Sequence, residues 1–118
     1  MKYLGFTVLV LTIMTLSQCK KEELDIAECI GTIPTYTADI KSILDVNCAS
    51  SGCHNASSQK KGYNLSTYDG AVAGAAKSAF LGSIQHKSGY SKMPKSSSKL
   101  SASDINKLSC WVQNGTPN

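Results

Sequence analysis

Two cysteines and a histidine stand close together in the stretch CASSGCH, residues 48–54. Such a set can hold a haem covalently, because each thiol adds to one vinyl group and the adjacent imidazole is delivered to one face of the iron. The usual spacing is Cys-x-x-Cys-His, whereas four residues separate Cys48 from Cys53, with His54 directly after. A disulfide between the two cysteines, or half of a zinc site, would use the same residues, so these alternatives stay open at this point.

A six-coordinate haem iron needs a second axial ligand, and Met93 is the candidate. Met1 and Met14 would be removed with an N-terminal signal peptide, so Met93 is the one methionine of the expected mature chain. A soft thioether suits haem iron and raises its reduction potential. Pro94 follows and restricts Met93 to extended conformations, which helps to fix the loop. His86 is the rival ligand, and a methionine packed into the core without metal is the other interpretation.

The first residues predict export. Lys2 gives a short positive start, and residues 3–16 form an apolar run with the length of a signal h-region, too short to span a bilayer comfortably. The sequence LSQC that ends at Cys19 resembles a bacterial lipobox. We therefore predict a signal peptide over residues 1–18 and lipid on Cys19, where several acyl chains would anchor the protein stably. A plain secretory signal cut nearby is the alternative.

The net charge is mild. The chain carries a formal charge of +4, from 12 lysines, no arginine and 8 acidic residues. Blocks of like charge are absent, which speaks against nucleic-acid binding. Lysines near an exposed haem edge would instead steer an acidic redox partner.

A helix is expected to lead into the cysteine motif. Ile40, Ile43 and Leu44 recur at helical spacing behind Thr37, a good N-cap. The predicted helix is roughly ten residues long, presents one apolar stripe and ends at Cys48.

Further helical patterns follow the motif. Residues 55–62 are polar and without period, and predict a loop. Ser66 is a good N-cap for an alanine-rich helix over about 67–77. The apolar residues Phe80, Leu81 and Ile84 indicate another short helix, after which residues 86–99 form a second polar loop.

The clearest helical signal lies at the C-terminal end. Ser101 and Asp104 have the spacing of a capping box, with Asp in place of the usual Glu, and Asn114-Gly115 is a stop signal. The expected inward face consists of Ile105, Leu108 and Val112, with Trp111 beside it. Convincing strands are absent, so we predict an all-α fold of three to four short helices over residues 36–118, preceded by a tether over residues 19–35.

Large aliphatic and aromatic residues are few after residue 26. A small domain with so few apolar residues usually needs additional stabilisation, such as a disulfide or a bound metal. A covalent haem offers a large apolar surface for short helices, which favours haem over a disulfide within the motif.

The order of these features resembles the class I cytochrome c fold, and more closely the c-type cytochrome domains of Bacteroidota and Planctomycetes lipoproteins. The resemblance covers residues 36–115: a first helix, Cys-x4-Cys-His, a Leu-Ser-Thr-Tyr helix start, Met-Pro, and then Leu-Ser-x3-Ile-x2-Leu-x2-Trp-Val-x2-Gly. It implies thioether bonds at Cys48 and Cys53, His54 as proximal ligand and Met93 as distal ligand. Arginine, which often meets the haem propionates in that family, is absent here. Lysines, Tyr63, Tyr68 or Trp111 would have to serve.

The sequence therefore predicts an electron carrier with one covalent haem c. It would be exported and held by lipid in a bacterial envelope membrane, facing the periplasm or the cell surface, and would act on a redox partner protein. With both axial positions filled it would not be an enzyme by itself. A zinc-binding or disulfide-stapled module using Cys48, Cys53, His54 and His86 is one alternative. A haem sensor or small peroxidase with an open site is the other, if Met93 does not bind iron.

The two remaining cysteines, Cys29 and Cys110, are predicted to form a disulfide. With Ile105 and Val112 inward, 100° per residue places Cys110 near the opposite side of its helix, so core packing does not explain it. An exposed free thiol is a liability on an exported protein. In the cytochrome c fold the first and last helices cross, so the segment from Cys29 is expected to lie over the outside of the last helix. Two free or intermolecular thiols are the alternative.

Overall fold

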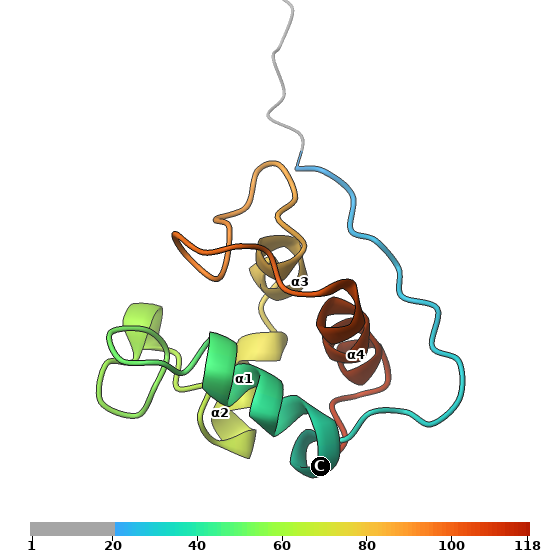
Figure 1. Cartoon of the computed structure of the whole chain (residues 1–118), viewed down its shortest axis with the longest axis horizontal. Coiled ribbons are helices and arrows are strands. Elements are labelled where there is room, and N and C mark those ends of the chain that lie inside the picture. The colour runs from blue at the N-terminus through green and yellow to red at the C-terminus, as the bar shows by residue number, and fades with distance from the viewer. Residues whose placement is uncertain (1–20) are drawn as a thin grey trace, which may run out of the picture.

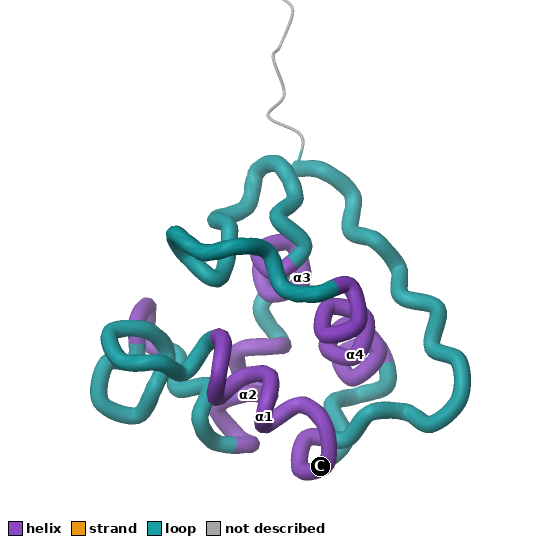
Figure 2. The backbone as a smooth tube through the Cα atoms, viewed as in Figure 1, coloured by secondary structure: helices purple, strands orange, loops and turns teal. Residues whose placement is uncertain are grey.

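The computed structural model of this chain describes residues 21–118. The predicted signal peptide over residues 1–18 and the predicted lipid site at Cys19 lie outside the described residues. Within residues 21–118 four α-helices surround a common core and strands are absent (Figures 1 and 2). The predicted all-helical fold class is confirmed at this level. Among these residues, every helix is too short or too polar to cross a membrane.

The first helical segment runs directly into the cysteine motif, as expected. A π-helical turn, Tyr36–Ile40, continues into α1, Lys41–Asn47, and Cys48 forms the C-cap. The predicted apolar stripe is buried, because Ile40 and Leu44 face the core and are fully covered. Burial of this stripe fixes the rotation of α1 and places Cys48 at the edge of the core.

Two helices begin at a different cap from the predicted one. Thr35, rather than Thr37, caps the first helical segment, and Thr67, rather than Ser66, caps α2. Both threonines have extended backbone, and each hydroxyl accepts the amide N–H three residues on. Ser66 instead donates its hydroxyl to the side chain of Asn64 at 2.6 Å.

The middle of the fold is made of two short helices, α2 (Tyr68–Ala75) and α3 (Ala79–Ile84). The glycines of α2 serve close packing. A Cβ at Gly74 would lie 2.6 Å from a methyl carbon of Leu65, so the side chain of Leu65 rests on the backbone of α2 at this point. The segment before α2 therefore folds back onto it.

The last helix, α4, spans Ala102–Gln113. The predicted cap is confirmed: the hydroxyl of Ser101 accepts the N–H of Asp104 at 3.0 Å and donates to its carboxylate at 2.8 Å. The helix ends at Gln113 with Asn114 as its C-cap, followed by Gly115 in the left-handed region with φ +82°. Both ends of α4 thus follow local sequence signals.

The buried face of α4 contains the predicted residues, but it is centred on Leu108 and Trp111. Leu108 and Trp111 are fully buried, whereas Ile105 and Val112 are only half-buried. Cys110, which was expected on the outer side of this helix beneath the segment from Cys29, is 2% exposed. It is covered because the N-terminal segment lies against this side of the helix.

Cys29 and Cys110 form a disulfide with a Cα–Cα distance of 5.5 Å, which confirms the predicted pair. Residues 21–35 contain no helix and run beside α4 (Figure 1, blue to teal). The predicted tether is therefore covalently joined to the helical domain rather than free along its whole length.

Candidate functional site

A tight turn after α1 brings together Cys48, Cys53 and His54. The N–H of His54 donates to the carbonyl of Cys48 at 3.0 Å, and the N–H of Cys53 donates to that of Ser50 at 3.0 Å. Gly52, with φ +77°, supplies the left-handed residue that the turn needs. The four-residue spacing is accommodated by closing the backbone back onto the first cysteine.

Both thiols of the motif are free, so the disulfide considered between Cys48 and Cys53 is not formed. Cys48 is buried and Cys53 is half-buried. Burial raises the pKa of the Cys48 thiol to about 11, and the neighbouring Cys53 adds to the rise. At neutral pH the first cysteine is therefore a protonated thiol.

This burial predicts slow alkylation of Cys48 in folded protein without haem. A rise in pKa from 9.0 to about 11 lowers the thiolate fraction about a hundredfold. In mildly alkaline buffer, iodoacetamide should therefore label Cys48 about a hundredfold more slowly in the folded chain than in urea. Peptide mass spectrometry over time measures the rate for each cysteine. Equal rates in the two conditions would show that the thiol is not buried.

The ring of His54 is oriented by a backbone carbonyl. Its Nδ1 lies 2.9 Å from the carbonyl oxygen of Lys60. Since a carbonyl can only accept, Nδ1 carries the proton in the neutral imidazole and Nε2 carries the lone pair. This is how proteins orient a metal-binding histidine: one nitrogen donates to the protein and leaves the other as ligand.

The loop after His54 is held in the shape that this hydrogen bond requires. The N–H of Lys60 donates to the carbonyl of Cys53 at 2.9 Å, and the N–H of Leu65 donates to that of His54 at 2.7 Å. A short 3₁₀ turn, Lys60–Gly62, lies between these two bonds. The polar sequence of residues 55–62 predicted a loop. It did not mark the Lys60 carbonyl as the partner of the His54 ring, because every residue carries a carbonyl.

Met93 is half-buried in the loop after α3 and is held by its backbone. Its N–H donates to the carbonyl of Ser83 at 3.1 Å. Its carbonyl accepts from Nε2 of His86 at 2.9 Å. His86, the alternative candidate for the second axial ligand, therefore binds the backbone of Met93.

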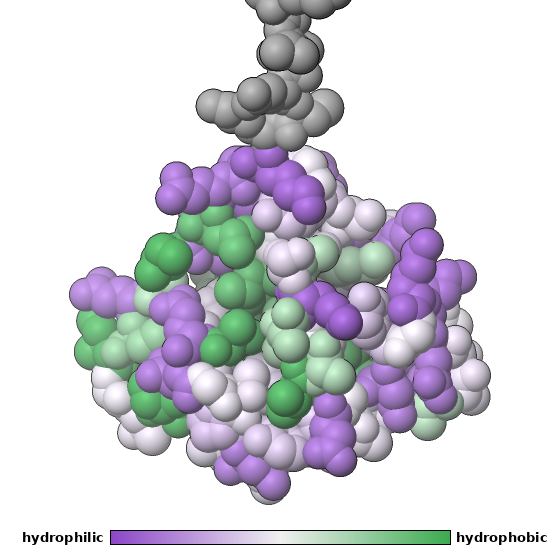
Figure 3. Space-filling model, turned by 180° about the vertical axis from the view of Figure 1, so that it is seen from behind, coloured by the Kyte–Doolittle hydropathy of each residue, from purple (hydrophilic) through white to green (hydrophobic). Residues whose placement is uncertain are grey.

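The two candidate ligand loops lie on one side of the molecule. In Figure 1 the loop after α1 and the loop after α3 both extend to the left, one below the other. Several apolar side chains pack against the core while remaining partly exposed: Tyr63, Val72, Phe80, Leu81 and Val112. Figure 3, which views the molecule from behind, shows further apolar side chains among hydrophilic ones, mostly in its left and central parts. A flat apolar group would find partners among the five partly exposed side chains named above.

Two of the residues considered for propionate binding have other partners. The indole N–H of Trp111 donates to the carbonyl of Pro117 at 2.8 Å, and the hydroxyl of Tyr68 donates to the carbonyl of Thr116 at 2.8 Å. Both side chains therefore hold the C-terminal tail. Tyr63 stays a candidate, with its ring centroid 6.0 Å from that of His54.

In the part of the chain that the structure describes, His, Cys, Asp and Glu side chains do not converge in groups of three or more that could hold a metal ion. Comparisons of the chain with known protein families, with curated proteins and with solved structures find no match.

Proposed function

We propose that this protein is a monohaem c-type cytochrome that carries one electron. The observation that supports it best is the hydrogen bond from His54 Nδ1 to the carbonyl of Lys60, in the same turn as two free thiols. A lone histidine at the surface has no need of a fixed tautomer. A histidine that binds iron through Nε2 needs its proton fixed on Nδ1, so that Nε2 keeps the lone pair that binds the metal.

The residues of the site fit a covalent haem. Cys48 and Cys53 would form the thioether bonds, His54 Nε2 would bind one face of the iron and the sulfur of Met93 the other. The bound haem would supply a one-electron couple. The chain would hold both axial ligands in place in either oxidation state, since the backbone hydrogen bonds of His54 and Met93 do not depend on the iron.

The charge of the two loops suggests the kind of partner. Asp69 is the one acidic residue between positions 46 and 103. The charge of Lys87 is paired with Glu22 and Asp25. The same stretch contains six other lysines: Lys60, Lys61, Lys77, Lys92, Lys95 and Lys99. Such a surface would steer an acidic redox protein and would lose this advantage as salt screens the charges. Export and lipid on Cys19 would place the exchange at a bacterial envelope membrane.

Covalent haem is the prediction that tests this function. Protein exported by a host with the c-type maturation machinery should be coloured, should keep its haem through acid–acetone extraction, and should gain the mass of one haem. The Cys48→Ser/Cys53→Ser double variant is the matched control and should lose the covalent haem, because no thiol remains to add to a vinyl group.

The same spectrum separates the other possibilities. A colourless wild-type protein that contains zinc would overturn the cytochrome in favour of a zinc-binding module. A high-spin ferric spectrum would indicate an open iron site, as in a sensor or small peroxidase.

A further inference from the structure

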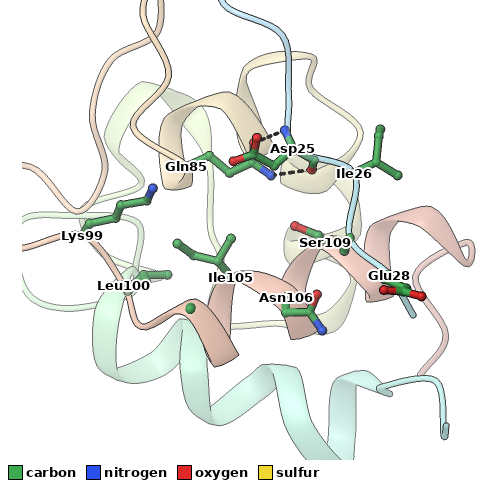
Figure 4. Close-up of a pocket in the computed structure, with 11 residues that line it drawn as sticks. Asp25, Ile26, Glu28, Gln85, Lys99, Leu100, Ile105, Asn106 and Ser109 are labelled. Carbon is green, nitrogen blue, oxygen red and sulfur yellow. Dashed lines mark hydrogen bonds between the residues drawn. The ribbon is translucent and has the colours of Figure 1, made fainter. Parts of the chain in front are cut away.

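Residues 21–29, which we call the N-terminal strap, are fastened to the segment that follows α3. The side-chain amide of Gln85 makes two hydrogen bonds to the backbone of Asp25, accepting from its N–H and donating to its carbonyl, both at 2.9 Å (Figure 4). Gln85 is 3% exposed. A buried amide satisfied in this way is costly to disrupt, because each unpaired partner would remain desolvated.

Further contacts extend this attachment toward the end of the strap. Glu22 and Ser88 exchange two hydrogen bonds: the N–H of Glu22 donates to the carbonyl of Ser88 at 3.0 Å, and the N–H of Ser88 donates to the Glu22 carboxylate at 2.8 Å. Lys87 reaches the carboxylates of Glu22 at 3.3 Å and Asp25 at 2.8 Å. These exposed ion pairs add little alone. Together with Gln85 they make one continuous junction.

The strap is attached at a second point by the disulfide from Cys29 to Cys110. Between the two points a groove of about 360 Å³ separates it from α4, lined by Leu100, Ile105 and Ser109 on the helix side. Figure 4 shows the strap running past Ser109, with Ile105 and Leu100 farther away across the groove. The strap is therefore held at its ends, by Gln85 and by Cys110, rather than by close packing along its length.

The segment that the strap holds leads directly to Met93. His86 follows Gln85 and binds the carbonyl of Met93, while Ser83 accepts the N–H of Met93. Tyr90 covers the last turn of α3 so closely that a Cβ at Gly82 would lie 2.5 Å from its ring. Residues 86–93 thus double back onto α3, and the strap is bonded to this loop at Lys87 and Ser88.

We infer that the N-terminal strap, joined to Gln85 and to Cys110, holds the loop 86–93 in place, and that His86 is the positioning residue for Met93. The consequence for iron ligation rests on the proposed function. The claim that the strap and His86 hold the loop rests only on contacts within the chain. Two measurements address the two parts separately.

The first measurement is amide hydrogen exchange at Met93 in the full chain as purified. Gln85→Met keeps the volume but removes both hydrogen bonds to Asp25. His86→Asn keeps a residue that tolerates the left-handed backbone at position 86, where φ is +55°, but cannot reach Met93 as the longer ring does. Each change should speed exchange of the Met93 N–H about tenfold. Tyr68→Phe, which removes a hydrogen bond of similar kind on the C-terminal tail, should leave it within about twofold.

The second measurement is the affinity of the haem protein for added imidazole, which competes with the sulfur of Met93. Both variants should bind imidazole about tenfold more tightly, and Tyr68→Phe should match wild type. If wild type lacks Met93 ligation, the proposed function fails at that point while the exchange measurement still decides on the strap.

Unchanged Met93 exchange in both Gln85→Met and His86→Asn would overturn the inference. Should Gln85→Met fail to fold, Glu22→Ala at the exposed end of the strap probes the same junction. It should speed Met93 exchange about threefold, and an unchanged rate there would count against the strap in the same way.

Discussion

Replacing Met93 with alanine will remove the weak far-red absorption of the oxidised protein, an expectation carried from cytochromes c with methionine ligation. The same change will lower the reduction potential by on the order of 0.2 V, because a soft thioether stabilises ferrous iron and axial ligands tune haem over a range of about 0.8 V. Met93→His should also lower the potential while keeping a low-spin spectrum, since a harder nitrogen ligand favours the ferric state. Visible spectroscopy and a redox titration measure both.

The matched control is His86→Ala. Because the ring of His86 binds the backbone of Met93 rather than standing free, its loss should loosen the loop but leave the sulfur ligand and its absorption in place. The opposite pattern, in which His86→Ala removes the absorption and Met93→Ala does not, would assign the ligand to His86.

Loss of the Cys29–Cys110 disulfide should lower the free energy of unfolding by about 4 kcal/mol in the chain-entropy model. The reason is the size of the loop: the two cysteines are 81 residues apart, so the bond removes much freedom from the unfolded chain. Cys29→Ser/Cys110→Ser, measured by urea unfolding against wild type, gives the change. A variant as stable as wild type would show that the bond contributes nothing in solution.

Counting thiols tests the pairing itself. In the Cys48→Ser/Cys53→Ser background the motif no longer contributes thiols, so unfolded, non-reduced mature protein with lipid on Cys19 should show no reactive thiol. Two reactive thiols would mean that Cys29 and Cys110 are not paired.

The sequence alone determined those elements whose signals lie within one or two turns of helix. The apolar stripe of Ile40 and Leu44 predicted a helix ending at Cys48, and Ser101 with Asp104 predicted where α4 begins. Local spacing is sufficient for both of these. The pairing of Cys29 with Cys110 was also predicted, but from the roles assigned to the other three cysteines and from the crossing helices that the resemblance implies.

Tertiary structure decided what depends on how the chain packs and not on the local spacing of residue types. Thr35 and Thr37 are both good caps, and only the packed chain selects Thr35. The rotation of α4, with Trp111 fully buried and Ile105 half-buried, follows from the C-terminal tail that accepts the indole N–H. The burial of Cys110 follows from the strap. Likewise, the carbonyl that orients His54 and the ring that holds Met93 are backbone-to-side-chain contacts across a loop. Every residue carries a carbonyl, so no residue type in the sequence marks the one that will be used.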